Sequence, residues 1–188
     1  VHGVMVEVQG MGVLIQGESG IGKSETALEL LDRGHRLIAD DSVRIKCLHG
    51  NTLWGYGLGN ALGYHMEIRG LGIIDVSHVY GLNAIIDSKQ IELVFQLEEW
   101  DNRKNYNRLG TSEEKLTLLN VSIPLITIPV KPGRNIPVLI EAAVMNQHLK
   151  RKGLNAARNF NQKLIRRNNS DSARNIWYSQ ENYRQEGA

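Results

Sequence analysis

Residues 17–24 read Gly17-Glu18-Ser19-Gly20-Ile21-Gly22-Lys23-Ser24, and this short stretch decides the fold. It follows an apolar run at 13–15 that is typical of a strand, and it precedes apolar residues at helical spacing over 27–31. A strand, a glycine-rich turn and a helix in this order form a phosphate loop, in which backbone N–H groups and the helix N-terminus face phosphate oxygens. The stretch therefore predicts an α/β domain with a nucleotide-binding core.

All eight residues of the stretch are expected to contact the nucleotide. The side chain of Lys23 should reach the β- and γ-phosphates, and the hydroxyl of Ser24 should ligate Mg²⁺. The metal is expected to be Mg²⁺ or Mn²⁺, because the single cysteine and five of the histidines show no zinc spacing: His35, His49, His65, His78 and His148. A phosphate loop alone leaves ATPase, GTPase and kinase open.

The rest of the chain alternates between strand-like and helical patterns. Alternation or apolar runs predict strands at 4–8, 37–39, 43–47, 91–97 and 121–130, and helices over about 136–152 and 154–167. Pro124 and Pro129 mark the strand at 121–130 as an edge strand or a bulged one, because proline lacks the N–H that a central strand donates. Residues 55–72 are rich in glycine and are expected to form functional loops with short strands, and 98–115 a long exposed loop.

Composition places the chain among ordinary globular proteins. Its 188 residues are 41% hydrophobic and 22% charged, enough for one core, with 1–152 expected as the core and 153–188 as a helix and basic tail of the same domain. The lone Cys47 excludes an internal disulfide and favours the cytoplasm. A net charge of +2 and the lack of a long apolar run argue against nucleic acid and membrane as partners.

Acidic residues stand at the end of the strand that follows the phosphate-loop helix. Asp40 and Asp41 are adjacent, so in an extended chain only one of them can face the γ-phosphate. In a kinase that carboxylate would accept the hydroxyl proton, and in a hydrolase it would orient water. The alternative is a turn-forming Asp pair before Ser42.

Glu67 and Arg69 occupy alternate positions and share one face of an extended segment. Glu67 is a candidate for the Mg²⁺ shell, and Arg69 for neutralising phosphate charge. Without further motifs, a Glu and an Arg at this spacing more often form a surface ion pair than a functional site.

Together, these motifs resemble one bacterial enzyme family, the HPr kinase/phosphorylases. The resemblance rests on residues 17–24 and 39–42, on the run Met66-Glu67-Ile68-Arg69-Gly70-Leu71-Gly72-Ile73-Ile74-Asp75, and on Lys131-Pro132-Gly133-Arg134-Asn135. It covers nearly the whole chain and is most specific in the run from 66 to 75. The family carries a further N-terminal domain, and a chain that opens on Val1 without methionine is expected to lack it.

The resemblance implies a bifunctional enzyme. It would phosphorylate a serine of HPr, the sugar phosphotransferase carrier, with ATP or pyrophosphate, and would cleave phosphoseryl-HPr with inorganic phosphate to give pyrophosphate. It also implies a role in carbon catabolite repression, a homohexamer, and a mixed sheet flanked by helices that is similar to the phosphoenolpyruvate carboxykinase core.

Roles of single residues follow from the same resemblance. It implies Asp41 as base and acid with His2 beside it, Lys23 on phosphate, Ser24 and Glu67 on Mg²⁺, Arg108 near the transferred group, and residues 131–135 as the loop used in dephosphorylation. Without a function, His2 would be a solvent-exposed strand residue, and Arg108 would be a charged residue of an exposed loop.

Two rival functions stay open on the residues alone. One is a small-molecule kinase, for which no substrate lid is recognisable. The other is a nucleotide-dependent switch, and the absence of an Asn-Lys-X-Asp element weighs against a GTPase version of it.

Overall fold

The computed structural model describes residues 1–57, 64–104, 106, 113–163 and 165. The chain divides into two compact units: Val1–Tyr106 with Ser112–Gln147, and Asn107–Thr111 with His148–Ala188. In the second unit, residues 156–163 are helical, within the helix predicted at 154–167, whose end and the basic tail lie outside the described residues. The sheet and the candidate site belong to the first unit.

A six-stranded mixed sheet forms the centre of the first unit. Its strands are β1 (Val4–Val8), β2 (Met11–Gly17), β3 (Arg36–Ala39), β9 (Leu93–Glu99), β10 (Glu114–Leu118) and β11 (Val121–Val130), in the order β10-β11-β9-β2-β1-β3. The strands β2, β9 and β11 are parallel, and the other pairings are antiparallel. The prediction of an α/β domain with a mixed sheet is confirmed.

β1 and β2 form a hairpin with a tight turn. Gln9 and Gly10 have φ of +49° and +82°, the left-handed pair that a two-residue hairpin turn requires. All five residues of β1 are buried, because both faces of the sheet are covered. The apolar run of β2 is thereby held in the centre of the sheet, and its last residue, Gly17, begins the glycine-rich loop.

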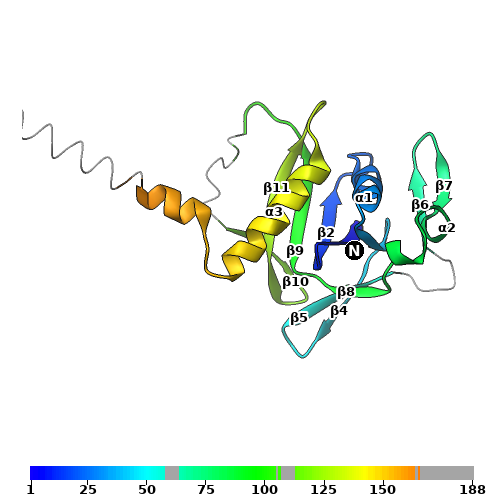
Figure 1. Ribbon diagram of the computed structural model, residues 1–188, viewed down its shortest axis with the longest axis horizontal. Helices are drawn as coiled ribbons and strands as arrows, with labels where there is room; N and C mark the ends of the chain where they lie inside the picture. Colours follow the sequence, from blue (N-terminus) through cyan, green and yellow to red (C-terminus); the bar gives the residue numbers. More distant parts are fainter. Residues whose placement is uncertain (58–63, 105, 107–112, 164, 166–188) are drawn as a thin grey trace, which may run out of the picture. The chain divides into compact units, whose positions relative to one another are not determined.

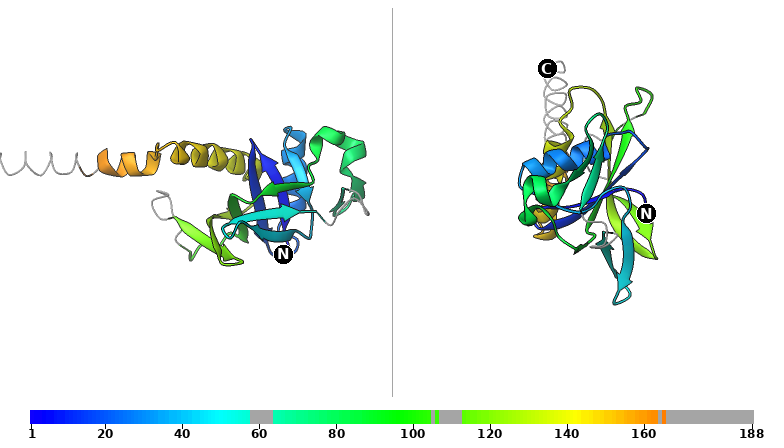
Figure 2. Two further views of the ribbon diagram at one scale, coloured as in Figure 1. Left: turned by 90° about the horizontal axis from the view of Figure 1, so that it is seen from below. Right: turned by 90° about the vertical axis from the view of Figure 1, so that its right-hand side faces the viewer.

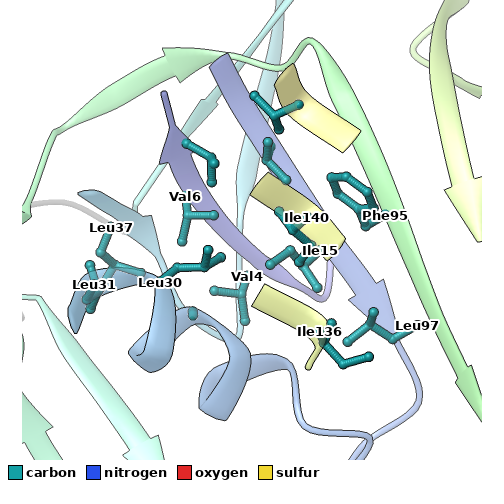
Figure 3. Close-up of a cluster of buried hydrophobic side chains, with 14 of the residues drawn as sticks. Val4, Val6, Ile15, Leu30, Leu31, Leu37, Phe95, Leu97, Ile136 and Ile140 are labelled. Carbon is teal, nitrogen blue, oxygen red and sulfur yellow. The ribbon is translucent and has the colours of Figure 1, made fainter. Parts of the chain in front are cut away.

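Two helices, α1 (Lys23–Asp32) and α3 (Ile136–Arg151), cover one face of the sheet (Figure 1). Leu30 of α1 and Ile140 of α3 are fully buried, together with Ile15 of β2. Figure 3 shows these side chains pointing into one layer between the helices and the strands. Burial of this layer fixes α1, and with it the start of the helix at the glycine-rich loop.

A three-stranded sheet of β4 (Arg44–Leu48), β5 (Thr52–Tyr56) and β8 (Ser88–Gln90) packs on the other face (Figure 2). Close contact requires glycine here: a Cβ on Gly55 would lie 2.1 Å from the sulfur of Met5 in β1. The turn at His49 and Gly50, with φ of +51° and +75°, closes the hairpin of β4 and β5. This packing buries Met5, whose side chain lies on the face opposite to Val4 and Val6.

A separate hairpin carries the glycine-rich run. β6 (His65–Ile68) pairs with β7 (Gly72–Asp75), and α2 (Val76–Tyr80) and the 3-10 helix η1 (Leu82–Ala84) follow. The short strands expected within 55–72 are therefore present toward the end of that range, as β6 and the start of β7. The helices α2 and η1 were not predicted.

The expectation of an edge strand at 121–130 is wrong for the strand as a whole, because β11 lies between β10 and β9. Each proline nevertheless has a strand on one side only. Pairing with β9 starts at Leu125, so Pro124 faces β10 alone, and pairing with β10 ends at Leu125, so Pro129 faces β9 alone. The missing N–H groups thus leave no ladder position unsatisfied.

Candidate active site

The predicted phosphate loop lies between Gly17, the last residue of β2, and Lys23, the first of α1. Gly20 and Gly22 have φ of +85° and +99°, a conformation that side-chain-bearing residues rarely adopt. No side chain caps the helix at Gly22. Backbone N–H groups of the first helical turn are therefore left for an anion.

Lys23 is folded back over this loop and is only 6% exposed. Its Nζ donates to the carbonyl oxygens of Gly17 at 3.0 Å and Glu18 at 2.9 Å. An ammonium has three N–H donors, so these two bonds orient the group and leave one donor for a bound anion.

Ser24 and Asp40 meet at the end of β3. The Ser24 hydroxyl donates to Oδ1 of Asp40 at 2.8 Å. Burial raises the pKa of Asp40, the neighbouring Asp41 charge adds to the rise, and hydrogen bonds from Ser24 and from the backbones of Asp41 and Glu67 oppose it. Of the two adjacent aspartates, the sequence analysis gave a role in the site to Asp41 and none to Asp40. Their shared position at a strand end indicated a site role for both.

Asp41 occupies a different environment from its neighbour. Its φ is +62°, so the chain turns sharply after Asp40, and its side chain is 82% exposed. Nδ1 of His2 lies 3.0 Å from the Asp41 carbonyl oxygen and 3.2 Å from its Oδ1. The structure thus brings His2 and Asp41 together, as the resemblance implied.

The β6–β7 hairpin approaches the phosphate loop from the same side. The backbone of Glu67 hydrogen-bonds the Asp40 carboxylate. The guanidinium of Arg69 lies so near Gly20 that a Cβ there would be 2.5 Å from it. Glu67 and Arg69 are therefore placed beside Ser24, Asp40 and the loop, and do not form an isolated surface ion pair with each other.

The other residues of the run at 66–75 build the hairpin. Met66 and Ile68 are buried in the core, Ile74 packs against it, and Leu71 and Ile73 are exposed. Gly70 and Gly72 have positive φ in the turn.

Asp75 caps α2 by accepting from the hydroxyl and backbone N–H of Ser77 and the N–H of His78. The pKa of Asp75 is held far below its usual range, most strongly by the hydrogen bond with the Ser77 side chain and next by the one with His78.

The predicted loop at 131–135 connects β11 to α3. Arg134 donates to the carbonyl oxygen of Pro129 at 3.0 Å, and Asn135 caps α3 by accepting from the N–H of Val138 at 3.1 Å. Gly133 turns the chain with φ of +81°, and Pro132 is exposed beside it. The Nζ of Lys131 lies 4.4 Å above the ring centre of Trp100. Arg108, the remaining predicted residue, lies outside the described residues.

The oxygen donors at Ser24 and Asp40 fit a hard cation such as Mg²⁺, which prefers one or two carboxylates and completes its shell with water and phosphate oxygens. Within the described part of the chain, no three His, Cys, Asp or Glu side chains cluster as a self-sufficient metal cage. Nor does that part contain a helix long and apolar enough to span a membrane.

The fold and this site define a class: mixed α/β domains that present a glycine-rich loop and a carboxylate pair at one edge of a sheet. The sequence model of one such family, described as HPr Serine kinase C-terminal domain, matches residues 1–164. The chain belongs to this family.

Similar proteins carry the name of the same family. The chain is 55% identical over 177 residues to the HPr kinase/phosphorylase of Treponema pallidum (strain Nichols), covering 94% of this chain and 56% of the relative. It is 53% identical over 165 residues to that of Bacillus mycoides (strain KBAB4), covering 88% and 53%. The chain thus spans about half the length of these relatives.

A solved structure is also similar. The HPr(Ser) kinase/phosphatase from Coxiella burnetii superposes with a TM-score of 0.75 at 35% identity, covering 85% of this chain and 96% of that chain.

Proposed function

We propose that this chain is the catalytic domain of a bifunctional serine kinase and phosphorylase acting on HPr. Forward, it transfers a phosphoryl group from ATP or pyrophosphate to a serine hydroxyl. In reverse, inorganic phosphate removes that group as pyrophosphate. The observation that carries the proposal is the placement of Lys23, Ser24, Asp40 and the His2–Asp41 pair around one loop, in a chain of this family.

The proposed forward step uses the contrast between the two aspartates. Asp41 is exposed and can meet a hydroxyl brought by a partner protein. Nδ1–H of His2 donates to Oδ1 of Asp41 and orients the carboxylate, which leaves Oδ2 to accept the serine proton. The serine oxygen then bonds to the terminal phosphorus while the bond to the leaving phosphate breaks. Lys23 and the loop N–H groups stabilise the charge on the phosphate oxygens.

The proposed reverse step uses the same carboxylate as an acid. An oxygen of inorganic phosphate attacks the phosphoserine phosphorus, the serine oxygen leaves, and protonated Asp41 returns the proton to it. Lys131 and Arg134, with backbone donors of the loop at 131–135, hold the attacking phosphate. One site therefore serves both directions.

Mg²⁺ is the cofactor that the donors suit, and Mn²⁺ is the alternative. Ser24 and Glu67 would hold it, and we add Asp40 to this set because it already bonds Ser24. When bound, the ion would neutralise part of the phosphate charge. Asp40, held by hydrogen bonds from two backbones, keeps the Ser24 hydroxyl oriented.

Further parts of the proposal extend to the whole protein. We propose a homohexamer located in the cytoplasm, a part in carbon catabolite repression, and a nucleotide core similar to that of phosphoenolpyruvate carboxykinase. Arg108 would approach the transferred phosphate. Residues 153–188 would dock HPr or a neighbouring subunit through their basic surface, in the same domain as the core at 1–152.

The test combines the chain with HPr, Mg²⁺ and labelled ATP, followed by inorganic phosphate. Label on a serine and then phosphate-dependent pyrophosphate release are expected. Nucleotide binding without either reaction would move the assignment to a nucleotide-dependent switch. Transfer to small alcohols in place of HPr would move it to a small-molecule kinase.

A further inference from the structure

Trp100 and Lys131 are brought together by the ends of two neighbouring strands. Glu99 and Val130, the last residues of β9 and β11, are paired in register, and the backbone N–H of Trp100 donates to the Val130 carbonyl oxygen at 3.1 Å. Trp100 and Lys131, the residues that follow these two strand ends, therefore lie side by side. Nζ of Lys131 lies 4.4 Å from the centre of the Trp100 ring, within the range of a cation–π contact.

The indole is itself held in place from several sides. Its Nε1–H donates to Oδ1 of Asn102 at 2.7 Å. The ring of Tyr106 lies 5.0 Å away, and the Tyr106 hydroxyl is fixed in turn by the N–H of Asp101 at 3.0 Å. A side chain that is 39% exposed is thus kept in one orientation by its neighbours.

Trp100 also lines a pocket that it shares with the phosphate loop. It lines an open pocket of about 750 Å³ whose lining includes Glu18 and Ile21 of that loop and Gln96 of β9. The ring that carries the Lys131 ammonium is therefore part of the pocket beside the loop.

We propose that Trp100 is a positioning residue that holds the Lys131 ammonium beside the phosphate loop for an inorganic phosphate or pyrophosphate oxygen. The inference rests on the proposed function of the loop at 131–135. Lysine loses rotamer freedom when it binds an anion, and a partner that restrains it beforehand lowers that cost. A carboxylate partner would neutralise the charge and occupy N–H donors. An aromatic face restrains the ammonium and leaves its charge and its donors for phosphate.

The first variant is Trp100→Leu, which removes the ring face. In phosphorolysis of phosphoseryl-HPr, we expect KM for inorganic phosphate to rise roughly threefold to tenfold, the loss that one cation–π contact implies. Trp100→Phe keeps an aromatic face and should retain most of the affinity. Tyr56→Leu removes the face under Lys46, a cation–π contact of the same kind on the three-stranded sheet, and should leave KM unchanged.

The direction of the reaction supplies a second readout. Pyrophosphate-driven phosphorylation is the reverse of phosphorolysis, and an enzyme variant cannot change the equilibrium constant, so kcat/KM for the pyrophosphate-driven reaction must fall by the same factor. ATP brings additional contacts through its adenosine and α-phosphate, and ATP-driven phosphorylation should change less than about twofold. Equal losses in the ATP-driven and phosphate-driven reactions would show a general structural defect and overturn the proposal.

A double-mutant cycle separates this inference from the function on which it rests. In a Lys131→Ala background, Trp100→Leu should have no further effect on KM for phosphate. A full effect in that background would show that Trp100 acts without Lys131 and would overturn the inference alone. If Lys131→Ala itself leaves phosphorolysis unchanged, the role proposed for the loop fails, and the positioning role of Trp100 fails with it.

Discussion

The two sides of the phosphate loop have opposite chemical characters. On the side of β3 and the β6–β7 hairpin, carboxylates meet short polar partners, such as Asp40 with Ser24 and Asp41 with His2. On the side of β9 and β11, a cation lies on an aromatic ring, Lys131 on Trp100. The first side suits a metal ion and a proton, and the second suits an anion. This contrast fits the proposed bifunctional reaction, which needs a proton acceptor on one side and a phosphate site on the other.

The carboxylate side should show the largest effect. Asp41→Asn keeps the shape but removes the proton acceptor, so we expect ATP-driven transfer to fall about 100-fold to 10,000-fold. ATP affinity should be unchanged, because the loop and Lys23 remain. Stopped-flow or quench assays of labelled transfer measure the rate, with Asp32→Asn at the exposed end of α1 as the matched control. Retained transfer would remove Asp41 as the base.

The centre of the loop should show the next largest effect. Lys23→Ala removes a buried ammonium that two carbonyl oxygens orient, and we expect ATP affinity to fall roughly 10-fold to 100-fold, as loss of a charged hydrogen bond implies. Calorimetry measures it. Lys46→Ala, an exposed lysine of β4, should bind ATP normally. Unchanged affinity in Lys23→Ala would count against nucleotide binding at this loop.

The approach of Arg69 to the loop can be tested at Gly20. Gly20→Ala strains a left-handed residue and places a Cβ 2.5 Å from the Arg69 guanidinium, so we expect about a tenfold loss of ATP affinity. Gly34→Ala has nearly the same backbone conformation, with φ of +86° and nothing near the added Cβ. It should lower the melting temperature without altering ATP affinity. Equal affinity losses in both variants would contradict the contact.

The smallest effect concerns stability on the carboxylate side. Folding raises the pKa of Asp40, chiefly by burial, so its ionisation opposes folding at neutral pH. Asp40→Asn should therefore raise the free energy of unfolding there, by about 1 kcal/mol, while it lowers activity.

The gain has a definite pH dependence. It should be complete above the raised pKa of folded Asp40 and shrink as pH falls through that value. It should be gone below the unfolded pKa of about 4. Denaturant titrations across this range measure it, and a gain that grows toward acid pH would show the opposite sign.

Local patterns were enough to predict the centre of the fold. The strand, loop and helix around residues 17–24 follow from apolar spacing and glycine positions. The position of β11 inside the sheet could not be predicted. Its prolines indicate where a backbone N–H is missing from the pairing, but they do not show which strands lie on either side of β11. The helix α2 was missed because its signal was one capping residue, Asp75, within a run that looked like a loop.

In the site, the sequence indicated the residues but, apart from the His2–Asp41 pair, not their partners. The Asp40–Asp41 pair was recognised, yet alternation along a strand cannot show that the chain turns at Asp41 with φ of +62°. That turn buries one carboxylate against Ser24 and exposes the other. Trp100 carried no motif, and its contact with Lys131 depends on pairing between strands that are distant in sequence.

The division of labour between the two sides is tested most directly by measuring ATP-driven phosphorylation of HPr and phosphorolysis of phosphoseryl-HPr on the same preparations of Asp41→Asn and Lys131→Ala. The account predicts that Asp41→Asn lowers both rates by a similar large factor. It predicts that Lys131→Ala lowers phosphorolysis and spares the ATP-driven reaction. Loss of both reactions in Lys131→Ala, or retention of either in Asp41→Asn, would contradict it.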